Sequence, residues 1–476
     1  MTYFSIRPYT SCRANSVASP SKPALQRWMA AKRTAQKLFL VCVLGSLLDL
    51  GVAYGQGPGS KQPAFEVVGS QLRIDSHIAK YDKYGHLLPW TSMEDAIDRE
   101  MQWYEKCPWE NGYPRFVTLT FMTGDYTATS RSDMIPAMQD GMGIISYLKY
   151  YHWKKESDPG ALKIARAMGD FLVKETLTPD SGKYPLFTRS TGHMGQLPLR
   201  ADTGSQADHP YEIEPDKGGI AGYALMLLYD QTHDARYLRQ ALQNARDLAR
   251  NMTPGDETHS PWPFRVDYRT GVARGPISSD MSYNLRLFDI LIAHGYTEFE
   301  QPRAKLWTWI KTIQIPNLQK GGSLWVQFFE DYSMEKNRNS WAPLNLARYL
   351  VEQRNSLDPD WKSDAKSLID FAVGNFCSIH FGLIVCGEQD DDKAPWGGAF
   401  STFGGVLAQY SAVTGDPEYK GMAWQILTLG LYAIDTDGSP RASIVQRYNG
   451  GWQEDAHTDK IHNYIDAMEA FPGWAH

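Results

Sequence analysis

Cysteine is scarce in this sequence, and its spacing excludes several classes of protein. Only five cysteines occur among 476 residues, and none forms a Cys-x-x-Cys pair, which argues against a zinc ribbon or a disulfide-rich scaffold. A Gly-rich phosphate-binding loop and a Gly-x-Ser-x-Gly elbow are also missing, so we expect neither phosphate chemistry nor a serine esterase. With 42% hydrophobic, 12% aromatic and 21% charged residues, the composition is that of a globular protein with a large core.

The N-terminal segment has the features of an export signal. The apolar run LFLVCVLGSLLDL, residues 38–50, contains Asp49 and is too short to span a bilayer. A basic stretch from Arg27 to Lys37 precedes the run, and the small residues Ala53 and Gly55, on either side of Tyr54, follow it, as in a secretory signal peptide. We therefore assign residues 1–55 to a signal peptide and an upstream segment, and we expect a secreted or periplasmic protein.

The remaining chain is acidic and holds few thiols. Beyond residue 55 there are 41 basic and 53 acidic side chains, a net charge of −12. This balance argues against nucleic acid or an anionic membrane as a partner once the signal is removed. Three cysteines remain, which allow at most one disulfide; Cys377 and Cys386 are the candidates.

A short pattern recurs along the chain. THDARYLRQA at Thr232 is repeated as TGDPEYKGMA at Thr414, and SDPGALKIA and LDPDWKSDA are shorter relatives. In each copy an Asp is followed seven residues later by Ala, and the Asp residues are Asp158, Asp234, Asp358 and Asp416. Asp caps a helix, Pro fits its first position, and residues at +3 and +7 share one face. The pattern therefore predicts four helix starts.

Each repeat contains two different helices. The segment before the cap, such as GGIAGYALMLLY, is apolar all round, whereas the segment after it has one apolar stripe. We predict that the first is an inner helix and the second an outer one. Outer helices are expected to begin near Met93, Asp158, Asp234, Glu298, Asp358 and Asp416. Inner helices are expected to begin near Ile135, Gly218, Met281, Trp341, Gly398 and His457.

Six hairpins of this kind favour a closed ring, because a ring buries every inner helix. We predict an all-α fold, an (α/α)6 toroid, with an open α-solenoid as the alternative. The domains are then an N-terminal arm at residues 56–92, whose structure the sequence does not settle, and a barrel at residues 93–476. The connections from outer to inner helices are long, so all the long loops should lie on one face of the ring.

The repeat, as in TGDPEYKGMA and THDARYLRQA, resembles the six-hairpin glycosidase-like superfamily over most of residues 93–470. That resemblance implies carbohydrate chemistry in the central cleft of an (α/α)6 barrel. The superfamily includes glycoside hydrolases, polysaccharide lyases and sugar epimerases. No motif assigns the chain to one of these families, so the resemblance supplies no catalytic residues.

The long loops are rich in acids, which suggests a catalytic pair of carboxylates. Glycoside hydrolysis needs one carboxyl group that stays protonated and one that is ionised. Asp216, Asp280 and Asp140 lie at the starts of inner helices, where negative charge is stabilised, and are candidates for the ionised group. Glu214, between Ile213 and Pro215, is our candidate for the acid, because an apolar setting raises a carboxyl pKa. Helix capping is the competing explanation for Asp216.

Aromatic side chains accompany these acids and predict a sugar-binding cleft, because flat rings suit the C–H faces of a sugar. The predicted substrate-binding residues are Tyr211, His209, Trp262, Trp341, Trp396, Trp452, Asp455 and Arg338. Packing beneath the loops is the competing explanation for the tryptophans.

Two other readings remain open. A polysaccharide lyase or uronate C5-epimerase would use Tyr, Arg and His, which the segment YPLFTRSTGHMGQLPLR at Tyr184 supplies. A non-catalytic carbohydrate-binding toroid is the second alternative. His457, Asp459 and His462 do not have the spacing of a helical zinc site. We therefore predict no metal and no cofactor, and our first hypothesis is an exported glycoside hydrolase acting on an oligo- or polysaccharide.

Overall fold

The computed structural model describes most of the chain beyond the N-terminal segment. The described residues are 62–63, 65–69, 71–118, 121–122, 126, 133–134, 136–190, 192–193, 211–327, 337–390, 397–441, 446–447, 453–454 and 457–476. They belong to one compact unit, Tyr54–His476. The predicted signal peptide lies outside these residues and stays a prediction. In the described part of the chain, no helix combines the length and apolarity needed to cross a membrane.

Inner and outer helices alternate along the chain, as the repeat predicts. The inner helices are α3 (Pro136–Trp153), α5 (Pro215–Thr232), α7 (Ser282–Ala293), α10 (Trp341–Gln353), α12 (Gly397–Thr414) and α14 (His457–Ala470). The outer helices are α2 (Met93–Glu105), α4 (Pro159–Glu175), α6 (Ala235–Asn251), α8 (Glu300–Trp309), α11 (Trp361–Phe376) and α13 (Pro417–Leu431). Every predicted start lies within three residues of an observed one.

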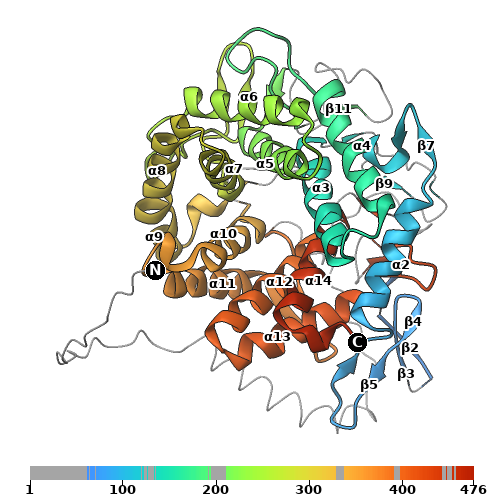
Figure 1. Ribbon diagram of the computed structural model, residues 1–476. Coiled ribbons are helices and arrows are strands. Elements are labelled where there is room, and N and C mark those ends of the chain that lie inside the picture. Colours follow the sequence, from blue (N-terminus) through green and yellow to red (C-terminus); the bar gives the residue numbers. More distant parts are fainter. Residues whose placement is uncertain are drawn as a thin grey trace, which may run out of the picture. The chain divides into compact units, whose positions relative to one another are not determined.

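These helices form a closed ring (Figure 1). Each inner helix contacts the next, and α14 contacts α3, so the inner circle has no open end. Outer helices α4, α6, α8, α11 and α13 each pack on the inner helix that precedes them, and α2 packs on α14. The (α/α)6 toroid is therefore confirmed. The first outer helix and the last inner helix together make the sixth hairpin.

Burial explains why the two kinds of helix differ in sequence. Helix α5 is buried along most of its length, whereas α6 buries one stripe that includes Tyr237, Ala241 and Leu248. Small residues allow the inner helices to pack closely. A Cβ atom on Gly219 of α5 would lie 1.9 Å from Oδ1 of Asn284 on α7, so this position accepts only glycine without a shift of the neighbouring helix.

Short strands form the N-terminal arm. Its strands are β1 (Gln62–Pro63), β2 (Phe65–Val68), β3 (Gln71–Ile74), β4 (His77–Ile78), β5 (Lys80–Tyr81) and β6 (Leu87–Leu88). Strands β2, β3 and β4 make one antiparallel sheet, and β5 pairs with β6. The arm is anchored beyond the end of α13, where Nε2 of His77 lies 2.8 Å from the carbonyl oxygen of Ile434.

The remaining strands lie between helices. They are β7 (Trp109–Glu110), β8 (Tyr113–Pro114), β9 (Phe121–Met122), β10 (Asp133–Met134), β11 (Gly192–His193), β12 (Glu212–Ile213), β13 (Arg265–Asp267), β14 (Ala273–Arg274), β15 (Cys377–His380), β16 (Leu383–Cys386), β17 (Gln446–Arg447) and β18 (Gln453–Glu454). Strands β12, β13 and β14 form a sheet that joins two long loops. A disulfide between Cys377 and Cys386 links β15 to β16 and confirms the predicted pair. Cys107 is free and buried.

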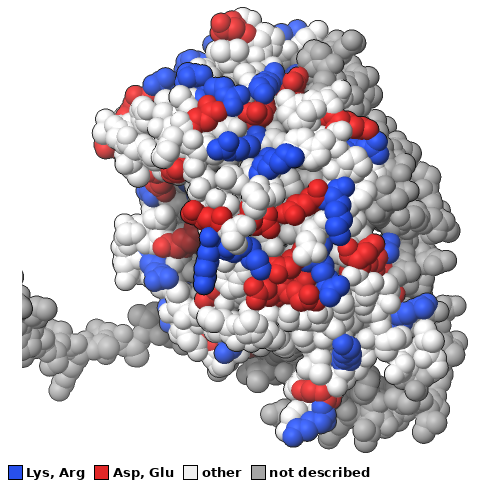
Figure 2. Space-filling view, turned by 45° about the vertical axis from the view of Figure 1, so that its right-hand side comes forward, with Lys and Arg blue, Asp and Glu red and all other residues white. Residues whose placement is uncertain are grey.

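Charged side chains of both signs cover the outer helices. On the face shown in Figure 2, basic and acidic residues are interspersed. Some charged residues of the outer helices pair with a neighbouring outer element; for example, Nε of Arg246 on α6 lies 2.9 Å from Oε1 of Glu298. Such exposed pairs add little stability individually.

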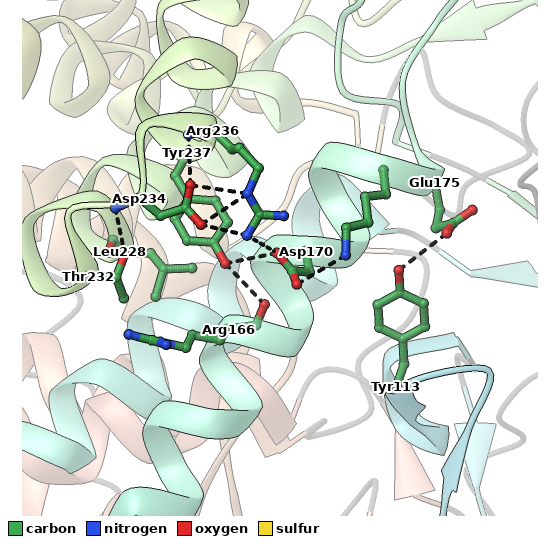
Figure 3. A network of polar contacts seen from close by, with 10 residues as sticks. Tyr113, Arg166, Asp170, Glu175, Leu228, Thr232, Asp234, Arg236 and Tyr237 are labelled. Atoms are coloured by element: carbon green, nitrogen blue, oxygen red, sulfur yellow. Dashed lines mark hydrogen bonds and ion pairs between the residues drawn. The ribbon is translucent and has the colours of Figure 1, made fainter.

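The repeated pattern forms the same contact in two places. In Figure 3, the side chain of Asp234 accepts a hydrogen bond from the backbone N–H of Arg236, and the hydroxyl of Tyr237 donates to Asp170 of α4 at 3.0 Å. At the last copy, Asp416 caps α13 and the hydroxyl of Tyr419 donates to Asp370 of α11. The capping Asp therefore starts the outer helix, and the aromatic residue at +3 ties it to the outer helix before it.

One predicted cap is wrong. Helix α11 begins at Trp361, with Asp360 rather than Asp358 at the N-cap position. The side chain of Asp358 instead accepts from the backbone N–H of Asp360 at 2.9 Å and lies 2.7 Å from Nζ of Lys311. The intervening residues form a turn before the helix, so the Asp that carries the pattern lies two residues too early to cap it.

Candidate active site

A cleft lies at the end of the barrel that receives the long loops. Its lining residues come from the first turns of α3, α5 and α10 and from the loops that precede α7 and α10. About 440 Å³ of space in the cleft, counting the open solvent at its mouth, is not filled by atoms. The described lining residues are Met138, Met142, Asp216, Lys217, Ile220, Phe264, Ser279, Asp280, Tyr283, Gln327, Asn339, Trp341 and Asn345.

Asp216 lies in this cleft as part of a buried ion pair. It occupies the first turn of α5, and its Oδ2 is 2.9 Å from Nζ of Lys217. Burial alone would lower the pKa of Lys217, but the attraction of Asp216 and Glu214 outweighs burial and raises this pKa. Lys217 is therefore a cation, and the positive end of the helix adds to the stabilisation of negative charge on Asp216. The side chain does not cap the helix.

Asp280 lies in the same cleft in a different environment. It precedes α7, and its two carboxyl oxygens accept hydrogen bonds from Ser282 Oγ at 2.9 Å and Asn345 Nδ2 at 2.8 Å. Burial raises the pKa of Asp280 despite these hydrogen bonds and the charge of Lys217, and the nearby charge of Asp216 raises it further. The cleft thus holds two interacting carboxyl groups, and burial favours the protonated form of Asp280.

Glu214 and Asp140, the other two predicted catalytic acids, are buried away from the cleft lining. Glu214 is completely buried, and its Oε1 is 3.1 Å from a guanidinium nitrogen of Arg265 on β13. Asp140 is also completely buried, on α3. The ion pair between Glu214 and Arg265 joins the start of α5 to the β12–β13–β14 sheet. Glu214 therefore holds in place the segment of chain that carries Asp216.

Of the predicted aromatic binding residues, Trp341 is the one placed in the cleft among those that the structure describes. Its Nε1 donates to Oε1 of Glu388 at 2.7 Å, which fixes the orientation of the indole. Phe264 and Tyr283 line the cleft beside it. Together with Met138 and Met142 of α3, these rings give the site an apolar wall facing the carboxyl groups.

Other predicted binding residues lie elsewhere. Trp262 is completely buried, and its Nε1 donates to the carbonyl oxygen of Leu248 at 3.0 Å, so it belongs to the packed wall under a loop. The ring of Tyr211 is covered by the guanidinium of Arg269 at 3.5 Å. Arg338 pairs with Asp390 at 2.7 Å. None of these three is among the described cleft-lining residues, and His209, Trp396, Trp452 and Asp455 lie outside the described part of the chain.

The segment that suggested lyase or epimerase chemistry is only partly described. Tyr184 is buried, and the buried Arg189 donates from Nε to the carbonyl oxygen of Thr176 at 2.9 Å. Both side chains therefore belong to the wall of the barrel. His193 lies on β11, and Arg200 lies outside the described residues. Across the ranges that the structure describes, no three His, Cys, Asp or Glu side chains gather as a metal site requires.

Sequence reasoning missed Lys217 and Asn345. Each carried a signal: Lys217 directly follows a predicted ionised Asp, and Asn345 interrupts the apolar sequence WAPLNLARYL at the start of an inner helix. A polar residue on a helix that is buried all round needs a hydrogen-bond partner. For Asn345 that partner is Asp280.

Comparison with known proteins supports the fold. No family model matches the sequence, and no curated protein matches it. A solved cellobiose 2-epimerase from Spirochaeta thermophila is similar at a TM-score of 0.58 and 13% identity, over 80% of this chain and 97% of that one. A D-mannose isomerase is similar at a TM-score of 0.58 and 11% identity, over 79% of this chain and 97% of that one. A family 76 glycoside hydrolase from a Bacteroides thetaiotaomicron strain is similar at a TM-score of 0.54 and 13% identity, over 81% of this chain and 78% of that one. These likenesses show the six-hairpin glycosidase-like fold.

Proposed function

We propose that this protein is an exported glycoside hydrolase that cleaves an oligo- or polysaccharide in the cleft at the long-loop end of the barrel. The observation that carries the proposal is the pair Asp216 and Asp280, two neighbouring carboxyl groups held in unlike environments. Such a pair is what glycoside hydrolysis requires. The printed names of the similar structures, an epimerase, an isomerase and a glycoside hydrolase, all concern carbohydrates.

The structure suggests a role for each group. Asp280, whose pKa is raised mainly by burial, is the general acid that protonates the leaving oxygen. Asp216, paired with Lys217, is the ionised carboxylate that activates water or stabilises the developing positive charge. This assignment moves the acid from Glu214, which faces Arg265 behind the cleft, to Asp280.

The cleft walls support binding of a sugar ring. Trp341, Phe264 and Tyr283 offer flat faces for the C–H surface of a pyranose. Gln327, Asn339 and Asn345 also place amide groups in the cleft, and amides can both donate to and accept from sugar hydroxyls. An apolar wall facing a few polar groups is the usual composition of a small-molecule site.

The test is the release of reducing ends from a panel of polysaccharides by the wild-type chain and by Asp280→Asn. We expect the variant to lose about 10²- to 10⁴-fold in kcat, the usual contribution of a general acid. The alkaline limb of the kcat profile, which reports deprotonation of Asp280, should disappear. Asp256→Asn, at a loop carboxylate that is 63% exposed, is the matched control and should keep full activity. Unchanged activity in Asp280→Asn would refute the assignment.

A sugar epimerase or isomerase is the second candidate, because two such enzymes match over 97% of their own length at the higher TM-scores quoted above. Either reaction moves a proton on carbon and leaves the glycosidic bond intact. The same panel, analysed by sugar composition after incubation, distinguishes these reactions from hydrolysis. A lyase would instead release an unsaturated sugar that absorbs in the ultraviolet.

Export is proposed on two observations. The predicted signal peptide precedes the barrel, and the Cys377–Cys386 disulfide is typical of oxidising compartments. Sequencing the N-terminus of the mature protein tests this, and a start near residue 56 is the expected result.

A further inference from the structure

A second cleft lies at the other end of the barrel. The first cleft is lined by residues near the amino ends of α3, α5 and α10, whereas the second is lined by the later turns of α3, α5 and α10 and by the part of α14 from His462 onward. About 1190 Å³ of this second cleft is not filled by atoms. Tyr283 of α7 lines both clefts, so the two sites lie along one barrel axis.

The floor of the second cleft is polar and buried. Arg348 of α10 and His462 of α14 are each almost completely buried, and Nη1 of Arg348 donates to Nε2 of His462 at 2.7 Å. Because Nε2 accepts this hydrogen bond, the ring proton lies on Nδ1, which is 3.1 Å from Ser146 Oγ. Burial and the charge of Arg348 lower the pKa of His462 well below its ordinary value. The histidine is therefore neutral.

Ion pairs line the walls of the second cleft. Lys149 pairs with Asp466 and lies 3.0 Å from Glu469, and Arg286 pairs with Glu352. The side chains of Lys149 and Arg286 are 29% and 10% exposed. The cleft therefore presents partly exposed cations beside carboxylates.

The composition of the lining indicates the ligand. Four acids and three bases line the cleft, namely Asp230, Glu352, Asp466 and Glu469 with Lys149, Arg286 and Arg348. A lining of nearly balanced charge does not favour a strongly charged ligand, but it offers both donors and acceptors to hydroxyl groups. Tyr223 and Tyr283 add neighbouring aromatic rings, with centroids 5.9 and 5.6 Å from the guanidinium carbon of Arg286 and 6.1 Å from each other.

We propose that this second cleft binds a neutral oligosaccharide, independently of the catalytic cleft. The side chains of Arg286, Glu352 and Lys149 hydrogen-bond to sugar hydroxyls, and the two tyrosines pack against a C–H face of the sugar. The site can hold part of a substrate chain, or product, away from the catalytic carboxyl groups. The proposal concerns binding alone and needs no particular reaction at Asp280.

The experiment is calorimetric titration of the full chain carrying Asp280→Asn, so that bound sugar is not consumed. The probes are cellotetraose, mannotetraose and xylotetraose, with a glucuronic acid tetramer as the charged comparison. We expect two molecules of at least one neutral tetraose per chain, and only one when Arg286→Gln is added. The control is Arg246→Gln, at an exposed arginine outside both clefts, which should keep two. If Arg286→Gln fails to fold, Lys149→Gln takes its place.

Three results would overturn the proposal. The first is that no neutral tetraose binds. The second is that neutral tetraoses bind and the variants of the second cleft leave every bound molecule in place. The third is that the acidic tetramer binds more tightly than the neutral probes, which would assign the cleft to anions. Each result is read without turnover, so it is separate from failure of the hydrolase proposal, which is judged by reducing-end release.

Discussion

A buried ion pair should control the stability of the seam where the ring closes. Glu100 of α2 and Lys460 of α14 are 0% and 1% exposed, and Nζ of the lysine lies 3.0 Å from Oε2 of the glutamate. Burial raises the pKa of Glu100 and lowers that of Lys460, and in each case the partner opposes burial without cancelling it. The charged form of each group is therefore stabilised by the opposite charge of its partner.

The size of the effect follows from this burial. Removing one member of a buried pair costs about 3–5 kcal/mol, because the remaining charge has no partner. We expect Lys460→Met to lower the free energy of unfolding by that amount at pH 8. The double variant Glu100→Leu/Lys460→Met should lie within about 1 kcal/mol of the wild type or above it, since apolar replacement of a whole pair is often neutral or stabilising.

The pH dependence gives an independent check. A carboxyl group whose pKa is raised in the folded state adds stability at pH values below its unfolded pKa and loses it as pH rises through the folded pKa. In Lys460→Met the attraction that opposes this shift is gone. The deficit relative to the wild type should therefore be smaller at pH 5 than at pH 8.

Urea unfolding at both pH values, followed by circular dichroism, measures these differences. Lys320→Met, at an exposed lysine whose side chain pairs with the exposed Glu257, is the matched control and should change stability by less than about 0.5 kcal/mol. A loss below about 1 kcal/mol in Lys460→Met, or a double variant as unstable as the single one, would refute the reasoning.

Two further predictions concern the packing of the ring and its disulfide. Gly219→Ala should destabilise the protein by about 1–3 kcal/mol, because the added Cβ would collide with Asn284. Gly374→Ala in α11, where the added Cβ meets open space, should instead stabilise the protein by about 0.5–1 kcal/mol. Thermal unfolding of both variants measures the difference, and equal shifts of the melting temperature would contradict it. Reducing the Cys377–Cys386 bond, which closes a short loop of sequence separation 9, should cost about 2–3 kcal/mol; urea unfolding with and without dithiothreitol measures this, and an unchanged midpoint would contradict it.

The ring could be predicted from the sequence because its signals are local. Each Asp cap is followed at fixed spacing by residues that share one helix face, and an apolar segment precedes it. Asp234 and Asp416 occupy their predicted N-cap positions, and the outer helix predicted near Glu298 begins at Glu300. The prediction that Asp358 caps α11 is wrong because the N-cap is Asp360, two residues later. The spacing pattern alone does not reveal the extra turn between Asp358 and the helix.

The site was harder to predict because it depends on contacts between distant residues. Whether a loop carboxylate faces the cleft or a buried cation is decided by its partner, and the partner of Glu214 is Arg265 on a strand from the next long loop. Asp216 and Asp280 could be placed at inner-helix starts, but their proximity and the role of Lys217 follow only from the folded ring. Trp262 shows the same limit, since its hydrogen bond to Leu248 cannot be read from composition.

The sixth hairpin joins α2, near the start of the described chain, to α14, near its end. During synthesis or passage through a translocation pore, the chain emerges from its N-terminus, so α2 must wait for its partner while the other five hairpins are already available. Until then the flanks of α3 and α12 that α14 covers stay open to solvent. When distant segments pair late, folding is slow and hydrophobic surface stays exposed to solvent and to aggregation. A helper protein that shields this gap would therefore favour assembly more than one acting on any single hairpin.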